Sequence, residues 1–246
     1  MCGIAGFSIC DKDHRVIDSR KLATALALQI QARGEDATGI AWSETDEHGI
    51  GVWYMKDAVP AEEFVRSLDQ IPKHTRTAII HTRYATKGSP ENNDNNHPIL
   101  VGETIGIHNG QVRNDDQLIQ MVGTGRTAQV DSEAIFRLID AAPSTDDLLK
   151  DLSLINGTAA IAWLNTQEPT TLHLCRICGS PLFVGTTPNG SMVFASLEHM
   201  LRAAAVRSGV RLSEIRSVPE GVYLKYVNGI VMDVARIGGK HLLERV

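Results

Sequence analysis

The sequence predicts an α+β protein built from two antiparallel sheets, with helices packed on their outer faces. Segments with strand-like patterns outnumber those with helical spacing, and the helical segments come in blocks. A doubly wound fold would instead alternate strand and helix regularly. No internal repeat, low-complexity tract or linker divides the 246 residues, so we expect one domain over 1–246.

The first strand is expected almost at the N-terminus, because residues 3–9 form a short apolar run rich in β-formers. After Ser19, a candidate N-cap, apolar residues at helical spacing predict a helix that ends near Gly34. The other expected helices are 60–70, 114–122, 131–141, 145–154 and 197–207. The other expected strands are 37–43, 50–56, 77–81, 99–107, 158–165, 171–178, 182–186, 191–195, 213–218, 221–227 and 230–236.

Two segments have the composition of irregular structure. Residues 87–98 contain no large aliphatic side chain and many turn formers, which predicts a loop. Asn109-Gly110 is a dipeptide typical of tight turns, so a turn is expected at 108–110, directly after the strand 99–107.

The charge balance excludes several partners. The chain carries 24 Lys and Arg against 29 Asp and Glu, a net charge of -5, and no segment concentrates basic residues as a nucleic-acid reader would. No apolar run reaches the roughly 18 residues of a membrane span, and the N-terminus lacks the basic start of a secretory signal. We therefore expect a cytoplasmic protein with no nucleic-acid or membrane partner.

The cysteines are too few for a disulfide scaffold, since only four occur, at positions 2, 10, 175 and 178. Cys175 and Cys178 have C-x-x-C spacing, but no second pair completes a zinc site and the nine histidines show no ligand spacing. We expect both to be packing residues, and Cys10 to be part of the core. The sequence predicts no metal site and no cofactor.

Cys2 is the strongest candidate for a catalytic residue. Removal of Met1 would leave a thiol and a free α-amino group on the same residue. An α-amino group has a reference pKa of about 7.7 to 8.0, so near neutrality it can act as a base. This is the arrangement of an N-terminal nucleophile. The alternative is a small buried hydrophobic residue at the start of a strand.

Three further positions combine suitable chemistry with a structural alternative. The Asn109 side chain and the Gly110 N–H are suited to an oxyanion hole, the alternative being a hairpin turn. Arg83 leads from a strand into the polar loop and is suited to clamp a carboxylate; the alternative is a surface salt bridge. Asp131 opens a helix, either as its N-cap or as a ligand for a substrate ammonium.

Taken in order, these features resemble the class II glutamine amidotransferases. The N-terminal sequence Met1-Cys2-Gly3-Ile4-Ala5-Gly6-Phe7 is similar to the start of that family's glutaminase domains. The other similar motifs are Arg33-Gly34-Glu35-Asp36-Ala37-Thr38-Gly39, the glutamine loop His81-Thr82-Arg83-Tyr84-Ala85-Thr86 with Asn96-His97-Pro98, His108-Asn109-Gly110, Asp131-Ser132-Glu133, Gly179-Ser180-Pro181-Leu182, Ala195-Ser196 with Glu198, and Pro219-Glu220-Gly221. The resemblance therefore covers essentially the whole chain.

The resemblance implies the αββα sandwich of N-terminal-nucleophile hydrolases and a glutaminase reaction. In it, Cys2 attacks the side-chain amide of L-glutamine, a γ-glutamyl thioester and ammonia form, and water releases glutamate. The Cys2 α-amino group acts as the base and then as the acid. Asn109 and Gly110 would stabilise the oxyanion.

The resemblance also implies how the substrate is held. Arg83 would bind the α-carboxylate of glutamine and Asp131 its α-ammonium, while Thr86 and the backbone of Tyr84 line the same pocket. Two opposite fixed charges would recognise the zwitterionic end and leave the amide facing the thiol. Substrates that lack either charge should then be poor.

The sequence departs from the family pattern in three places. Tyr84 stands where many members have Trp, and Lys87 stands where members like glucosamine-phosphate synthase have His. The chain ends at Val246, about where a glutaminase domain ends, without a synthase domain. The first hypothesis is a stand-alone glutaminase that supplies ammonia to a separate synthase subunit. The alternatives are a hydrolase of another γ-glutamyl amide, and a silent interaction module that retains the fold.

The composition of the loop 87–98 also leads to an expectation about activity. A loop this polar is expected to be too mobile to hold Arg83 until something orders it. The sequence therefore predicts weak activity alone and stimulation by a partner.

Overall fold

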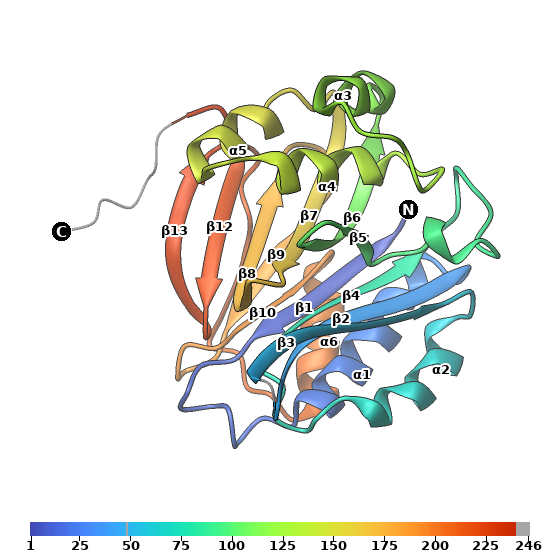
Figure 1. Cartoon of the computed structure of the whole chain (residues 1–246). Coiled ribbons are helices and arrows are strands. Elements are labelled where there is room, and N and C mark those ends of the chain that lie inside the picture. The colour runs from blue at the N-terminus through green and yellow to red at the C-terminus, as the bar shows by residue number, and fades with distance from the viewer. Residues whose placement is uncertain (48, 240–246) are drawn as a thin grey trace.

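The computed structural model describes residues 1–47 and 49–239, so the end of the predicted domain 1–246, from residue 240 on, lies outside the described residues. Two antiparallel sheets lie face to face between two layers of helices (Figure 1). The predicted α+β sandwich is therefore confirmed. None of the helices in the described residues is both long enough and apolar enough to cross a membrane.

The first sheet contains the strand that directly follows Cys2 and the strand that ends at Arg83. Its strands are β1 Gly3–Ser8, β2 Ala37–Asp46, β3 Gly49–Asp57, β4 Thr77–Arg83, β9 Phe183–Thr186, β10 Met192–Ala195 and β11 Glu214–Ser217. They pair antiparallel in the order β11-β9-β10-β1-β4-β2-β3. The N-terminal strand β1 is thus an interior strand, which fixes the start of the chain.

The second sheet carries the candidate oxyanion residues. Its strands are β5 Ile99–Val101, β6 Thr104–Val112, β7 Gly157–Asn165, β8 Glu168–Arg176, β12 Val222–Val227 and β13 Ile230–Arg236. They pair antiparallel in the order β13-β12-β8-β7-β6-β5. Interior side chains of both sheets, including Ile4, Ile79, Ile107 and Phe194, form the apolar layer between them.

The helices cover the two outer faces (Figure 1). Those packed on the first sheet are α1 Ser19–Ile30, α2 Ala61–Phe64 and α6 Glu198–Ser208, and those on the second are α3 Asp115–Val122, α4 Ser132–Ala141 and α5 Thr145–Leu152. Short 3₁₀ helices occupy Gln31–Arg33, Val65–Gln70 and Asn93–Asn95. Asp18, one residue before the expected cap Ser19, caps α1 by accepting from the Lys21 N–H.

One local prediction is wrong. The expected strand 99–107 is divided by a turn at Gly102, which has φ +51°, and Asn109-Gly110 lies inside β6 instead of in a turn. There Asn109 pairs with Ala160 and Gly110 with Ala159 on β7. Pairing across the sheet has overridden the local turn preference of Asn-Gly. The expected helix 60–70 becomes α2 followed by a 3₁₀ helix, and the other elements lie where predicted with ends shifted by a few residues.

Candidate active site

Strand β1 places Cys2 beside the end of β4. Gly3 pairs with Thr82, so the chain before Gly3 runs next to the residues that follow Thr82. The Cys2 Sγ lies 3.4 Å from the backbone N of Tyr84, which donates to it, and 3.6 Å from the Tyr84 carbonyl oxygen. Figure 1 shows the N-terminus at this end of β1, between the two helical layers. The thiol is thus held by the backbone of the glutamine loop.

The environment of Cys2 favours the neutral thiol. Burial raises the pKa of the thiol above its ordinary value, although the Tyr84 backbone and the positive charges of the N-terminus, Arg83 and Arg33 act in the opposite direction. A thiol with a raised pKa needs a base before it can attack. Met1 is 76% exposed, so the bond that masks the α-amino group of Cys2 lies at an accessible position.

The motif at 33–39 contacts Cys2 and the segment that follows β4. Arg33 Nε donates to the Cys2 carbonyl oxygen at 2.7 Å, and Asp36 Oδ2 accepts from the Ala85 N–H at 2.6 Å. A Cβ on Gly34 would overlap the backbone of Arg83, so only glycine permits this close approach. The sequence resemblance marked this motif without giving Arg33 or Asp36 a role; contacts between distant segments supply it.

The candidate oxyanion donors lie on β6. Asn109 is 1% exposed, and its Nδ2 is buried without a hydrogen-bond partner. Gly110 is exposed with φ +154°, and a Cβ at this position would overlap the Thr158 carbonyl oxygen. An unpartnered buried amide donor is costly, which indicates that it awaits a ligand or a water molecule.

A contact between the two sheets places these donors at the end of the molecule where Cys2 lies. His81 Nε2 lies 3.2 Å from the carbonyl oxygen of His108, which joins β4 to β6. His81 is two residues before Arg83, and His108 directly precedes Asn109. The strand ends that carry Cys2 and Asn109 are therefore neighbours across the sandwich.

Arg83 is buried, with 3% exposure, and its guanidinium contacts the loop 87–98. Nη1 donates to Asn96 Oδ1 at 2.8 Å, and Nη2 donates to the carbonyl oxygens of Lys87 and Gly88, both at 2.7 Å. Arg83 and the loop 87–98 are thus joined by three hydrogen bonds, and the dependence of activity on a partner stays a prediction. Arg83 itself supplies the donors that the loop carbonyls need.

The remaining predicted site residues have looser surroundings. Asp131 is half-buried, and its carboxylate accepts from the Val112 N–H at 2.6 Å instead of capping α4. Thr86 is exposed and makes no hydrogen bond within the described residues, and the Tyr84 side chain is 55% exposed. No hydrogen bond in the described part of the chain joins Asp131 or Thr86 to Cys2.

A surface depression of 480 Å³ is lined by Met1, the residue before Cys2, and by Arg33, Glu35, Asp36 and Tyr84. Arg33 Nη2 is buried without a hydrogen-bond partner among the described residues. Because Met1 forms part of this wall, removal of Met1 would change the shape of the depression.

Three buried histidines surround the site. The rings of His97 and His81 lie with centroids 4.2 Å apart and are tilted by 31°, and neither ring nitrogen of His97 has a partner in the described structure. Burial lowers the pKa of His81 to about 3 and places that of His97 well below its ordinary value. His108 is bound through Nδ1 to Ser132 at 2.9 Å. The neutral rings act as packing groups, and those of His81 and His108 also make hydrogen bonds, a role that the sequence did not reveal.

The other cysteines are free thiols. Cys10 and Cys175 are buried, and Cys178 lies beyond the end of β8. Within residues 1–47 and 49–239, no group of three His, Cys, Asp or Glu side chains is arranged to hold a metal ion.

Comparisons with known proteins match this arrangement. Residues 81–203 match the model of a glutamine amidotransferase domain. Among curated relatives, the glutamine–fructose-6-phosphate aminotransferase (isomerizing) of Salmonella typhi is 27% identical over 193 residues, which are 75% of this chain and 30% of the relative. The enzyme of the same name from Geobacillus kaustophilus is 29% identical over 210 residues, 82% of this chain and 33% of the relative. The chain thus spans about a third of the length of these relatives.

Solved structures share the fold. A glutamine phosphoribosylpyrophosphate amidotransferase from B. subtilis superposes with a TM-score of 0.76 at 21% identity, over 96% of this chain and 49% of that one. A glutamine aminotransferase class-II domain protein from Silicibacter pomeroyi gives a TM-score of 0.57 at 12% identity, over 96% of this chain and 99% of that one. The family model matches residues 81–203, which are half of this chain. The chain therefore belongs to the class II glutamine amidotransferase domain family.

Proposed function

We propose that this domain hydrolyses the side-chain amide of L-glutamine to glutamate and ammonia, with Cys2 as the nucleophile. The observation that carries the proposal is the thiol of Cys2 held between the backbone N and O of Tyr84, with an unpartnered Asn109 amide on the facing sheet. Acyl transfer requires a nucleophile and a hydrogen-bond donor that is free to bind the oxyanion. Cys2 and Asn109 offer these two groups at one end of the sandwich.

The reaction starts once Met1 has been removed. The α-amino group of Cys2 accepts the thiol proton as Sγ adds to the amide carbon of glutamine. The Asn109 side chain and the Gly110 N–H stabilise the oxyanion, a contribution of roughly 3 to 4 kcal/mol per donor in other enzymes. The ammonium proton then moves to the leaving nitrogen, the C–N bond breaks, and ammonia leaves. Water, activated by the same amine, hydrolyses the thioester.

The glutamine zwitterion is held by opposite charges in this proposal. Arg83 binds the α-carboxylate with guanidinium N–H groups beyond the three that hold the loop, and Asp131 binds the α-ammonium. Thr86 and the Tyr84 backbone complete the pocket. The ammonia is consumed by a synthase subunit supplied in trans, so glutamate release should rise when the acceptor subunit is added.

The experiment that tests the proposal combines glutamate release with intact mass on the wild type, Cys2→Ser and Cys2→Ala. A diazo-ketone analogue of glutamine is added to the wild type. We expect a chain without Met1, one adduct on Cys2, and no turnover in either variant. A chain that keeps Met1, or an unlabelled Cys2, would contradict the proposal.

A further inference from the structure

Asp115, the first residue of α3, is a buried carboxylate that receives two cations. It is 6% exposed, and its Oδ2 accepts from Lys87 Nζ at 2.7 Å and from Arg126 Nη2 at 2.9 Å. Burial raises the pKa of this carboxyl, but the hydrogen bonds from Lys87 and Arg126 lower it overall, below its ordinary value. Asp115 is therefore ionised near neutrality and holds both cations.

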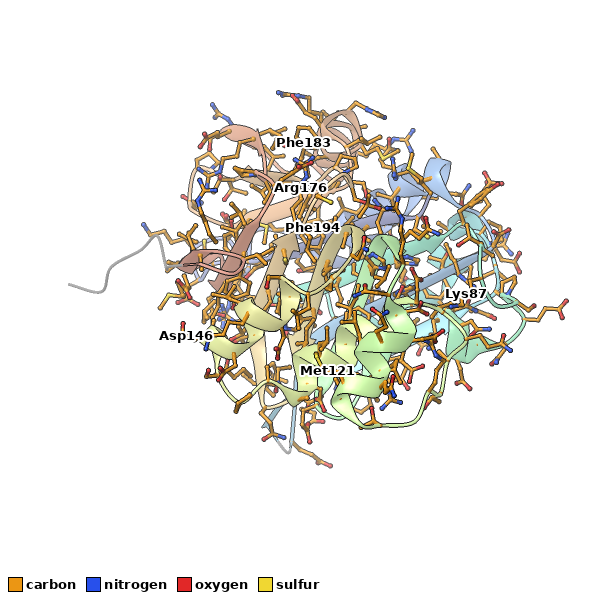
Figure 2. All side chains as sticks on the ribbon, turned by 90° about the horizontal axis from the view of Figure 1, so that it is seen from above. Lys87, Met121, Asp146, Arg176, Phe183 and Phe194 are labelled. Carbon is orange, nitrogen blue, oxygen red and sulfur yellow. The ribbon has the colours of Figure 1, made fainter. Side chains whose placement is uncertain are left out.

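The first cation, Lys87, belongs to the loop 87–98. The carbonyl oxygen of Lys87 accepts from Arg83 Nη2 at 2.7 Å. Asp115 thus anchors, through the Lys87 side chain, the residue whose backbone holds the Arg83 guanidinium. Figure 2 shows Lys87 on the opposite side of the molecule from Asp146 of α5.

The second cation belongs to the segment that leads into α4. Arg126 Nη1 donates to the Val130 carbonyl oxygen at 3.1 Å, and Val130 directly precedes Asp131. Asp115 is therefore linked through Lys87 to the backbone that holds Arg83. Through Arg126 it is also linked to Val130, the residue before Asp131.

A neutral contact joins the same two segments. Asn95 is completely buried, its Nδ2 donates to the Ser89 carbonyl oxygen at 3.0 Å and to Gln129 Oε1 at 3.1 Å, and its Oδ1 accepts from the Gln129 N–H at 2.7 Å. The loop 87–98 and the segment before α4 are thus linked at two separate points. The link through Asp115 is formed by charged groups, and the link between Asn95 and Gln129 by neutral ones.

We propose that Asp115 is a positioning residue that sets the spacing between Arg83 and Asp131, and thereby the recognition of the charged end of an α-amino-acid substrate. The inference rests on the proposed function, in which those two residues bind the α-carboxylate and the α-ammonium. Asp115 makes no hydrogen bond to Cys2 in the described structure. Because the two charges of an α-amino acid are a fixed distance apart, loosening this tie weakens substrate binding and leaves the thiol chemistry intact.

The test compares Asp115→Asn with Asp116→Asn. Asp116 is the matched control, since it follows Asp115 on the same helix and also pairs with Arg126, at 2.7 Å, but has no contact with Lys87. In Asp115→Asn we expect the KM for glutamine to rise about tenfold, with kcat within about twofold of the wild type. Asp116→Asn should resemble the wild type in both constants. An unchanged KM in Asp115→Asn, or a fall in kcat without a rise in KM, would overturn the inference.

A labelling experiment separates this inference from the proposed function. The diazo-ketone analogue of glutamine alkylates Cys2 with loss of N₂ and carries the α-amino-acid end, whereas iodoacetamide lacks that end. Intact mass should show the analogue reacting about tenfold more slowly in Asp115→Asn, with the iodoacetamide rate unchanged. A wild type that the analogue labels but that releases no glutamate contradicts the function alone. Equal analogue rates in Asp115→Asn and wild type overturn the inference alone.

A second variant provides the same test in case Asp115→Asn does not fold. Lys87→Met breaks the same tie from its exposed end, because the Lys87 side chain is 51% exposed. If Asp115→Asn does not fold, Lys87→Met should show the same rise in KM and the same slow reaction with the analogue. A normal KM and labelling rate in Lys87→Met would overturn the inference.

Discussion

Arg33 Nε and the carbonyl oxygen of Cys2 are joined by a hydrogen bond of 2.7 Å, across 31 positions of the chain. This bond fixes the carbonyl group of Cys2, while the Tyr84 backbone contacts its thiol. Cys2 is thus restrained at its carbonyl group and at its side chain. The orientation of its α-amino group, which the proposed reaction uses as a base, depends on that restraint.

Arg33→Met should therefore lower kcat more than it changes KM. A hydrogen bond from a charged donor contributes about 1.5 to 3 kcal/mol, so we expect kcat to fall roughly 10- to 100-fold. Steady-state glutamate release measures the effect. Arg202→Met is the control, because Arg202 pairs with Glu198 on the exposed surface of α6. An unchanged kcat in Arg33→Met would mean that the Cys2 backbone needs no such support.

The sequence pattern predicted the strands, and the position of Cys2 beside one of them, because these depend on short-range signals. The apolar run at 3–9 predicted β1, and the position of Cys2 next to it predicted its placement at a strand end. The supports of the site depend on long-range contacts, such as Arg33 with Cys2 or Lys87 with Asp115, which no local pattern encodes. The same limit explains the wrong turn at 108–110, where pairing with β7 decides the conformation.

Gly110→Ala should abolish glutamate release and destabilise the fold. Its φ of +154° disfavours any side chain, and the new Cβ would overlap the Thr158 carbonyl oxygen, so β6 must shift at the oxyanion position. Gly123→Ala is the matched control, since Gly123 also has a positive φ, +74°, but a Cβ there meets nothing within 4 Å. The control should lose about 1 kcal/mol of stability and keep its activity. Equal activity losses in the two variants would contradict this explanation.

The buried histidines predict acid sensitivity. Burial lowers the pKa of His173 and of His81 to about 3 in the folded protein, while an unfolded chain binds these protons below about 6.5. The unfolded state therefore binds more protons in that range, and stability falls as the pH drops from about 6.5 toward 3. Each such histidine costs about 1.4 kcal/mol per pH unit once the pH is well below 6.5.

His173→Phe tests this dependence away from the active site. The ring of His173 stacks on Trp163 at 4.8 Å, and phenylalanine preserves that aromatic contact. Losing the His173 bond to the Tyr223 hydroxyl lowers stability at every pH, so the comparison uses the slope. Urea unfolding between about pH 7 and pH 5 should give the variant an average slope smaller by about 1 kcal/mol per pH unit, because His173 of the unfolded chain is only partly protonated near pH 6.5. Parallel slopes would show that His173 does not contribute.

Asp131→Asn should raise the KM for glutamine by roughly 10- to 100-fold with little change in kcat, because it removes the charge that binds the α-ammonium. Asparagine keeps an oxygen that can accept from the Val112 N–H, the bond that Asp131 makes in the structure. Asp140→Asn is the control, since Asp140 accepts from the Glu103 N–H in the turn between β5 and β6 and has no proposed contact with substrate.

The sharpest readout of the Asp131 charge compares glutamine with glutaramate, which has the same amide and no α-ammonium. The wild type should prefer glutamine, and Asp131→Asn should lose most of that preference, because only the substrate with the cation benefits from the carboxylate. Asp140→Asn should keep the wild-type ratio of kcat/KM. If Asp131→Asn slows both substrates by the same factor, Asp131 acts through its bond to β6, and the α-ammonium must be recognised elsewhere.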